Sequence, residues 1–169
     1  AQPVLYVQRG LGGERRELVN VNRLDASGEL ALDWYEPSRD GRYVAFESYA
    51  SNLVASDTNF TSDIFVRDLQ TGTTPRVSTA SDEAQSNSNS QGAAISADGH
   101  YVAFESYASN LVAGDTNGTS DVFVHDLATG ETMRVASDGT QGNNRSHTPL
   151  ISGDGTKVAF SSYASNLVA

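Results

Sequence analysis

Apolar residues along the chain occur in short runs of four to seven residues, separated by stretches rich in Ser, Thr, Asn, Asp and Gly. The runs contain β-branched and aromatic residues, which favour strands, and the polar stretches between them favour turns. No stretch of twelve or more residues places its apolar positions at the 3.6-residue period of a helix. This pattern predicts an all-β chain.

The runs belong to an internal repeat. Residues 42–55 and 100–113 differ only at their first position. Residues 157–169 match residues 43–55 and 101–113 except at Lys157, which replaces a tyrosine, and at Ser161, which replaces a glutamate. The spacings of the copies are 58 and 56 residues. The polar segment 57–72 likewise matches 115–130. A fixed period of this length is typical of proteins in which similar units pack side by side.

Each unit contains four segments that predict strands. In the second unit these are residues 93–97, 101–107, 121–127 and 132–136. Gly99 and Gly130 lie between successive segments, where a hairpin turn needs a positive φ angle. Four short antiparallel strands at a fixed period are typical of a β-propeller blade.

The same template divides the whole chain into a single partial propeller of about three blades. Residues 4–8 and 16–21 match third and fourth strands, and residues 149–152 and 157–162 match first and second strands. The first complete blade has strands at 30–36, 43–49, 64–69 and 76–79. The chain is thus predicted to contain two, four, four and two strands, in a half blade (1–28), two blades (29–80 and 91–137) and a half blade (147–169).

Three blades are too few for a ring, which needs about four to eight. The two half blades would leave sheet edges with unpaired backbone groups, and such edges pair with other chains. We therefore expect a homodimer in which the half blades complete each other and form a six-bladed ring. The alternative is that the sequence is a fragment of a longer chain.

The repeated core resembles a known family. Residues 96–104, followed by 121–130 with the sequence Asp-Val-Phe-Val-His-Asp-Leu-Ala-Thr-Gly, resemble the WD40-like (PD40) repeats of TolB-type β-propellers. This resemblance covers about residues 41–169. It implies a propeller fold.

The first part of the chain resembles a different family. Residues 4–9, 16–20 and 30–46 are similar to the start of the propeller domain of prolyl oligopeptidases. In that family the propeller controls substrate access, and a separate α/β-hydrolase domain performs the hydrolysis. The chain has no Gly-x-Ser-x-Gly motif, and its histidines (His100, His125 and His147) lie in strands or turns of the repeat, so we expect no catalytic residues.

The charge and the composition of the chain argue against nucleic acids and membranes as its partners. The formal net charge is −10 and the pI is near 4.5, so the electrostatic field repels nucleic acids. No apolar run reaches the ~18 residues of a membrane span, and we expect no charged-then-apolar leader before Ala1. We expect a soluble protein with neither nucleic acid nor membrane as partner. The absence of cysteine leaves the compartment open, including an extracytoplasmic one.

Two polar loops are candidate metal sites. In each, a carboxylate, an amide oxygen and a second carboxylate stand at positions one, three and seven, a spacing similar to that of calcium loops. The candidate ligands are Asp57, Asn59 and Asp63 in one loop and Asp115, Asn117 and Asp121 in the other. In the alternative interpretation, Asp57 and Asp115 start Asx-turns, and Asp63 and Asp121 accept backbone donors at the start of a strand.

Other repeated side chains have structural interpretations. Glu47 and Glu105 are paired carboxylates of the kind that glycosidases use, but as repeat equivalents they are expected to lie apart in separate blades. Phe46, Phe104 and Phe160 are expected in the core between blades. The tyrosines that follow them (Tyr49, Tyr107 and Tyr163) are expected either in the core or as a ring of surface aromatics for sugar or peptide stacking.

The sequence therefore favours a non-catalytic propeller scaffold without a cofactor, with calcium as the one candidate left open. Its expected partners are a second copy of itself and a protein, peptide or glycan ligand. The alternative is the substrate-gating propeller of a prolyl oligopeptidase-like peptidase that lacks its hydrolase domain.

Overall fold

The computed structural model describes residues 4–8, 10–20, 34–136 and 140–167. Its secondary-structure elements are all β-strands, and they form four antiparallel sheets with the strand orders β1-β2, β3-β4-β5, β6-β7-β8-β9 and β10-β11. The strands are β1 (Val4–Gln8), β2 (Arg15–Asn20), β3 (Trp34–Pro37), β4 (Tyr43–Ser48), β5 (Asp63–Asp68), β6 (Ser90–Ile95), β7 (Tyr101–Ser106), β8 (Asp121–Asp126), β9 (Thr132–Arg134), β10 (Ser146–Ile151) and β11 (Val158–Ser162).

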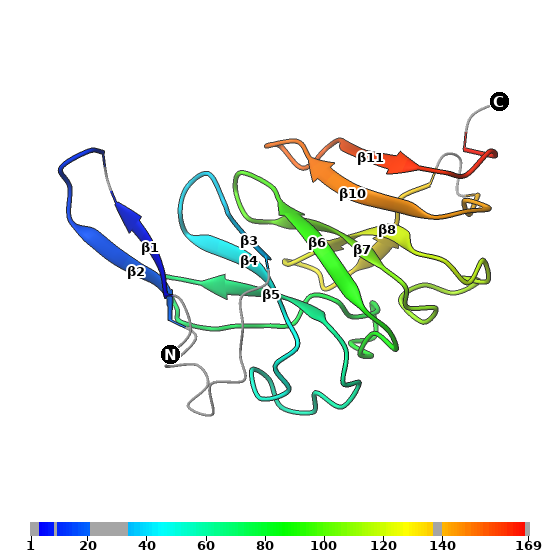
Figure 1. The fold of residues 1–169 in the computed structure, drawn as a ribbon, viewed down its shortest axis with the longest axis horizontal. Coiled ribbons are helices and arrows are strands. Elements are labelled where there is room, and N and C mark those ends of the chain that lie inside the picture. Colours follow the sequence, from blue (N-terminus) through cyan, green and yellow to red (C-terminus); the bar gives the residue numbers. More distant parts are fainter. Residues whose placement is uncertain (1–3, 9, 21–33, 137–139, 168–169) are drawn as a thin grey trace.

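The sheets follow one another in chain order, with the β1–β2 hairpin at one end and the β10–β11 hairpin at the other (Figure 1). Two-stranded sheets at both ends agree with the predicted half blades, and the all-β propeller architecture is confirmed. Predicted residues 21 and 30–33 lie outside the described residues. No helix in the described ranges is long and apolar enough to cross a membrane.

The first strand of each later blade begins earlier than predicted. Strand β6 starts at Ser90 instead of residue 93, and β10 starts at Ser146 instead of residue 149. In each strand a β-bulge shifts the register, and the polar residues before the bulge still pair with the second strand. The bulges contain Gly92 at φ +59° and Thr148 at φ +54°. A polar run with a bulge has no period-2 pattern, so the apolar pattern alone missed this half of the strand.

The predicted fourth strand of the first complete blade (76–79) is reduced to an isolated bridge between Phe65 and Arg76. The backbone N–H of Val77 still donates to the carbonyl of Ile64 at 2.8 Å. Pro75 has no N–H to donate, which shortens the ladder at this edge. In the second blade the equivalent β9 forms three ladder pairs with β8.

The core lies within and between the blades. Phe46 stacks on Phe65 with ring centroids 5.6 Å apart, and Phe104 stacks on Phe123 at 5.9 Å, with all four rings fully buried. Phe104 and Phe123 belong to one cluster of eleven buried apolar side chains from both complete blades, which joins one blade to the next. The cluster comprises Ala45, Ile64, Val66, Val77, Ala93, Ile95, Val102, Phe104, Ala108, Leu111 and Phe123.

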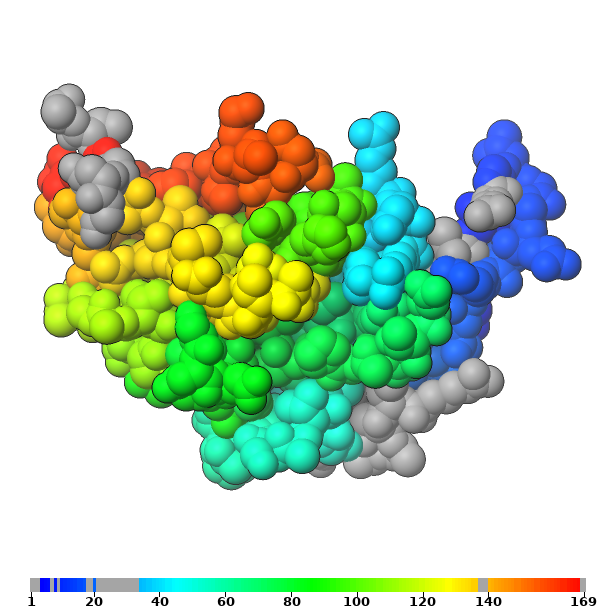
Figure 2. All heavy atoms as spheres, turned by 180° about the vertical axis from the view of Figure 1, so that it is seen from behind, coloured from blue at the N-terminus to red at the C-terminus, as the bar shows by residue number. Residues whose placement is uncertain are grey.

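Burial decreases at both ends of the row of blades. The space-filling view shows the β1–β2 hairpin, in blue, projecting at one end, and the β10–β11 hairpin, in orange and red, forming the opposite end (Figure 2). Ala159 of β11 is exposed, whereas its repeat equivalents Ala45 and Ala103 are fully buried. Positions that are buried in the complete blades are therefore exposed in the terminal half blades.

Candidate functional site

The first candidate loop does bring its predicted residues together. The side-chain amide of Asn59 donates to Asp63 Oδ2 at 3.0 Å. Gln85 Nε2 donates to Asp57 Oδ1 at 2.8 Å and to Asp63 Oδ2 at 3.4 Å. The hydroxyls of Ser78 and Ser86 donate to the other oxygen of Asp63. The two carboxylates thus share one buried polar network.

A guanidinium lies beside both carboxylates. Arg76 Nη1 is 3.5 Å from Asp57 Oδ1 and 3.6 Å from Asp63 Oδ2. Neither Nε nor Nη1 of Arg76 makes a hydrogen bond, so the guanidinium acts on the carboxylates chiefly through its charge. Burial raises the pKa of Asp57, and the neighbouring charge of Asp63 acts in the same direction.

The second loop repeats this arrangement. Asn117 donates to Asp121, Gln141 donates to Asp115 at 2.8 Å, and Arg134 lies 4.0 Å and 3.8 Å from the two carboxylates. Burial likewise raises the pKa of Asp115. The arginine and the glutamine were missed by sequence reasoning, although both recur with the repeat and could have been found by aligning the units.

The network fixes the loops as turns. The backbone N–H of Thr61 donates to Asn59 Oδ1 at 3.1 Å, and that of Thr119 donates to Asn117 Oδ1 at 3.0 Å, so Asx-turns begin at the two asparagines. Asx-turns that begin at Asp57 and Asp115 stay a prediction. Asp63 and Asp121, however, accept mainly side-chain donors, not the backbone donors expected at a strand start. No group of three or more His, Cys, Asp or Glu side chains that could hold a metal occurs in the described ranges. Calcium binding by these loops stays a hypothesis, beside the alternative that the loops are turns without a metal.

The polar linkers between blades fasten each blade to the next. Asn87 Nδ2 donates to Ser109 Oγ at 3.0 Å, and Asn110 Nδ2 donates to the carbonyl of Gln85 at 2.7 Å. The next linker repeats both bonds, from Asn143 to Ser165 and from Asn166 to Gln141. Several polar side chains of the linkers therefore make hydrogen bonds within the chain.

Glu47 and Glu105 border the same cavity, of about 400 Å³, contrary to the expectation that repeat equivalents stay apart. The cavity is lined by first and second strands of neighbouring blades and by Trp34, Glu36 and Arg145, among others. Burial raises the pKa of Glu36. Sequence reasoning missed this convergence because it depends on the angle between blades.

Each of the two glutamates is held by donors of its own. Glu47 accepts from Ser62 Oγ at 2.9 Å and from the backbone N–H of Gly92 at 3.2 Å. Glu105 pairs with Arg145 at 3.0 Å. Both therefore connect one blade to the next across the cavity.

The repeated tyrosines follow the surface alternative. Tyr49, Tyr107 and Tyr163 are 59%, 41% and 70% exposed, whereas Phe46 and Phe104 are buried as expected and Phe160 is half-buried.

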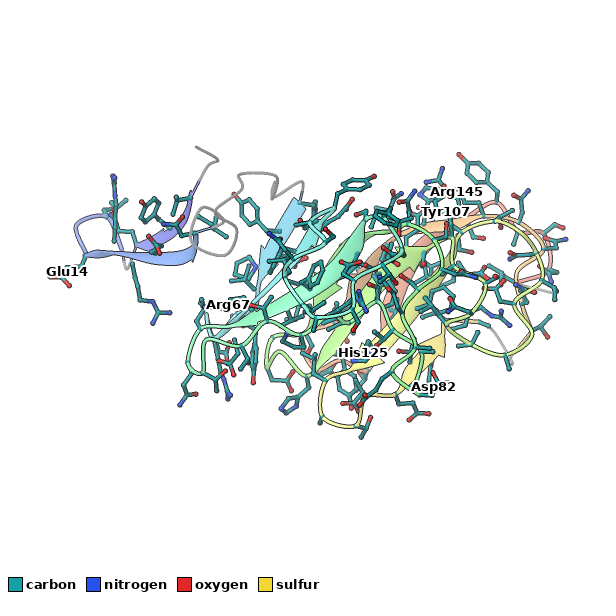
Figure 3. All side chains as sticks on the ribbon, turned by 90° about the horizontal axis from the view of Figure 1, so that it is seen from below. Glu14, Arg67, Asp82, Tyr107, His125 and Arg145 are labelled. Carbon is teal, nitrogen blue, oxygen red and sulfur yellow. The ribbon has the colours of Figure 1, made fainter. Side chains whose placement is uncertain are left out.

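His125 is buried, with Nδ1 2.9 Å from Thr132 Oγ1, and burial lowers its pKa. Figure 3 shows Arg145 at the opposite end of the molecule from Glu14, which lies at the tip of the β1–β2 hairpin.

Solved structures similar to this chain are β-propellers. TolB from Acinetobacter baumannii has a TM-score of 0.58 and 20% identity, over 97% of this chain and 33% of that chain. A putative TolB from Agrobacterium tumefaciens has a TM-score of 0.58 and 18% identity, over 98% of this chain and 48% of that chain. A prolyl endopeptidase structure has a TM-score of 0.60 and 18% identity, over 94% of this chain and 22% of that chain.

The chain thus spans less than half the length of each of these proteins. No protein-family model matches the sequence, and no curated protein matches it. At this level of identity the likeness establishes the fold alone. The resemblance of the fold to TolB-type and prolyl oligopeptidase propellers is therefore confirmed.

Proposed function

We propose that this chain is a non-catalytic β-propeller scaffold that completes its ring by pairing with a second copy. The observation that carries the proposal is the complementarity of the two terminal sheets. Strands β1 and β2 match the third and fourth strands of a blade, and β10 and β11 match the first and second. Two copies, each with two complete blades and two half blades, make six blades, within the range that closes a ring.

The hydrogen bonds and ion pairs of the buried carboxylates support a scaffold without catalytic activity. Asp63 accepts two hydroxyl donors and lies beside a guanidinium, Glu105 pairs with Arg145, and Glu47 has a donor on each oxygen. A catalytic carboxylate must be free to exchange a proton or contact a substrate atom. These groups are instead used to hold loops and blades together.

Two surfaces are suited to ligand binding. The cavity bordered by Trp34, Glu36 and Glu47 offers an indole and carboxylates at the inner strands of the blades. The exposed Tyr107 and Tyr163 offer flat rings of the kind on which peptides or sugars stack. We propose a protein, peptide or glycan as the ligand.

Sedimentation velocity over a micromolar concentration series tests self-association. The proposal predicts a species of two chains that dissociates on dilution. A single species with the mass of one chain at every concentration would refute ring closure between copies.

The alternative function is the gating propeller of a prolyl oligopeptidase-like peptidase. It is favoured by the fold shared with the prolyl endopeptidase, of which this chain covers 22%. A fluorogenic proline-containing peptide separates the alternatives when a purified hydrolase domain is supplied. Size-selective protection of long substrates by this chain would favour gating, and unchanged hydrolysis would favour the scaffold.

A further inference from the structure

The two complete blades share one pairing register between their second and third strands. Phe46 of β4 lies opposite Phe65 of β5, and Phe104 of β7 lies opposite Phe123 of β8. In both blades the opposed rings stack and are fully buried. A stacked aromatic pair therefore marks the correct register of this junction.

The terminal half blades hold one member of this pair each. The sequence Leu5-Tyr-Val of β1 aligns with Ile64-Phe-Val of β5 and with Val122-Phe-Val of β8, so that Tyr6 takes the place of Phe65 and Phe123. Tyr6 is therefore the third-strand aromatic, and its side chain is 55% exposed.

At the other end, Phe160 of β11 is the second-strand aromatic, because it lies in the third copy of the Val-Ala-Phe motif. It is half-buried, whereas Phe46 and Phe104 are fully buried. Within the described ranges, β1 pairs only with β2 and β11 pairs only with β10. Among the described residues, neither Tyr6 nor Phe160 therefore lies opposite another aromatic ring.

We propose that β11 of one copy pairs antiparallel with β1 of a second copy, with Phe160 stacked on Tyr6. This inference rests on the proposed self-association and specifies its register. The pairing of Glu47 with Ile64 in β4–β5 then places Ser161 opposite Leu5. Two identical junctions use both edges of both copies, so the assembly is closed.

A cavity beside Gly41 supports the same placement. The ring of Tyr43 packs against Gly99 of the following blade, and Tyr101 packs against Gly155, but nothing lies within 4 Å of the corresponding position on Gly41. A cavity of about 890 Å³ opens there, between the β1–β2 hairpin and the first complete blade. It is lined by two carboxylates, Glu14 and Asp40, and by three arginines, Arg16, Arg39 and Arg42.

The third-repeat residue equivalent to Tyr43 and Tyr101 is Lys157, which directly precedes β11. Pairing of β11 with β1 of a second copy brings the partner's Lys157 to this cavity. There its aliphatic stem can cover Gly41 and its ammonium can meet a carboxylate. The empty position and the residue that would fill it thus lie at opposite ends of the same chain.

Disulfide trapping tests the register, because the chain has no cysteine of its own. The double variant Leu5→Cys with Ser161→Cys places directly opposed cysteines, whose Cβ atoms lie about 4.5–5.5 Å apart in such a pair. Mild oxidation should give a covalent dimer on a non-reducing gel. In the matched control, Leu5→Cys with Ser162→Cys, the second cysteine points to the other face of the sheet and should remain free.

The outcomes separate the register from self-association. Trapping of both variants to the same extent, or a disulfide within one chain, would overturn the proposed junction. An untrapped double variant that still has the mass of a dimer by light scattering would overturn the register and leave self-association intact. An untrapped monomer would overturn both.

A second variant tests the aromatic pair. Tyr6→Asp should weaken dimerisation at least ten-fold while the circular dichroism spectrum of the monomer stays unchanged, because Tyr6 is exposed in the single chain. Phe60→Asp is the control, since Phe60 is 88% exposed and belongs to the loop between β4 and β5. Equal dimerisation constants for the two variants would contradict the stacking of Tyr6 on Phe160.

Discussion

Tyr43 lies so close to Gly99 of the next blade that a Cβ atom on Gly99 would be 2.1 Å from Tyr43 Cδ2. The next pair of blades repeats the contact, with 2.3 Å between the same position on Gly155 and Tyr101 Cδ2. Both glycines also have a positive φ angle, +74° and +70°. The hairpin turn of one blade is thus fitted against an aromatic ring of its neighbour.

Replacing Gly99 by alanine should therefore destabilise the protein for two reasons. The positive φ angle costs about 1–2 kcal/mol with a Cβ, and displacing the Tyr43 ring adds about 1–3 kcal/mol. Gly130→Ala is the control, because Gly130 has φ +76° and nothing within 4 Å of its Cβ position. Urea unfolding should show a larger loss for Gly99→Ala, and equal losses would mean that the ring contact contributes nothing.

Thr148→Gly should stabilise the protein. Thr148 occupies the bulge position that Gly92 holds in the preceding blade, with a β-branched side chain at φ +54°. Removing that strain gains about 1–2 kcal/mol, and the greater freedom of glycine in the unfolded chain offsets about 0.5–1 kcal/mol. The net gain of roughly 0.5–1 kcal/mol should raise Tm by about 1–4 °C.

Gly92→Thr provides the reciprocal test. Nothing lies within 4 Å of the Cβ position on Gly92, so only the φ angle should oppose the threonine. This variant should lose stability while Thr148→Gly gains it. A loss of stability in both variants would contradict the equivalence of the two bulges.

Stability should decrease as the pH falls below about 6.5, the ordinary pKa of histidine. Burial lowers the pKa of His125, so in the window between its folded pKa and 6.5 the unfolded chain binds more protons than the folded one. The loss should be complete once the pH has fallen through the folded pKa. Urea unfolding from pH 7.5 to 5 checks this dependence.

His125→Gln should flatten this part of the pH profile, because no titrating group remains at the buried position. His100→Gln is the control, since that side chain is 60% exposed. If His100→Gln flattened the profile and His125→Gln left it unchanged, the assignment to His125 would be wrong.

Calcium should leave Tm unchanged. In the loop of Asp57 and Asp63, the charge of Arg76 lies where a dication would have to approach the two carboxylates, and Arg134 has the same place in the second loop. Differential scanning fluorimetry with millimolar calcium, and again with a chelator, checks this. A rise in Tm with calcium that is lost in Asp57→Asn with Asp115→Asn would establish the calcium loops predicted from the spacing.

The sequence allowed the second and third strands to be predicted closely, because Val44 to Phe46 and Ile64 to Val66 form compact apolar runs that recur with the repeat. Two features depend on contacts that a linear pattern does not contain. The early start of β6 at Ser90 requires a bulge, and the cavity shared by Glu47 and Glu105 requires the angle between two blades. The contacts of Arg76 were missed as well, since its partners Asp63 and Asp57 lie 13 and 19 residues before it in the chain, although an alignment of the units shows that the arginine recurs as Arg134.

Small-angle X-ray scattering with in-line size exclusion tests ring closure most directly. The account predicts twice the chain mass of 17.9 kDa, about 36 kDa, and a distance distribution typical of a compact disc with a central channel. Scattering from an open row of blades with the mass of one chain would contradict it.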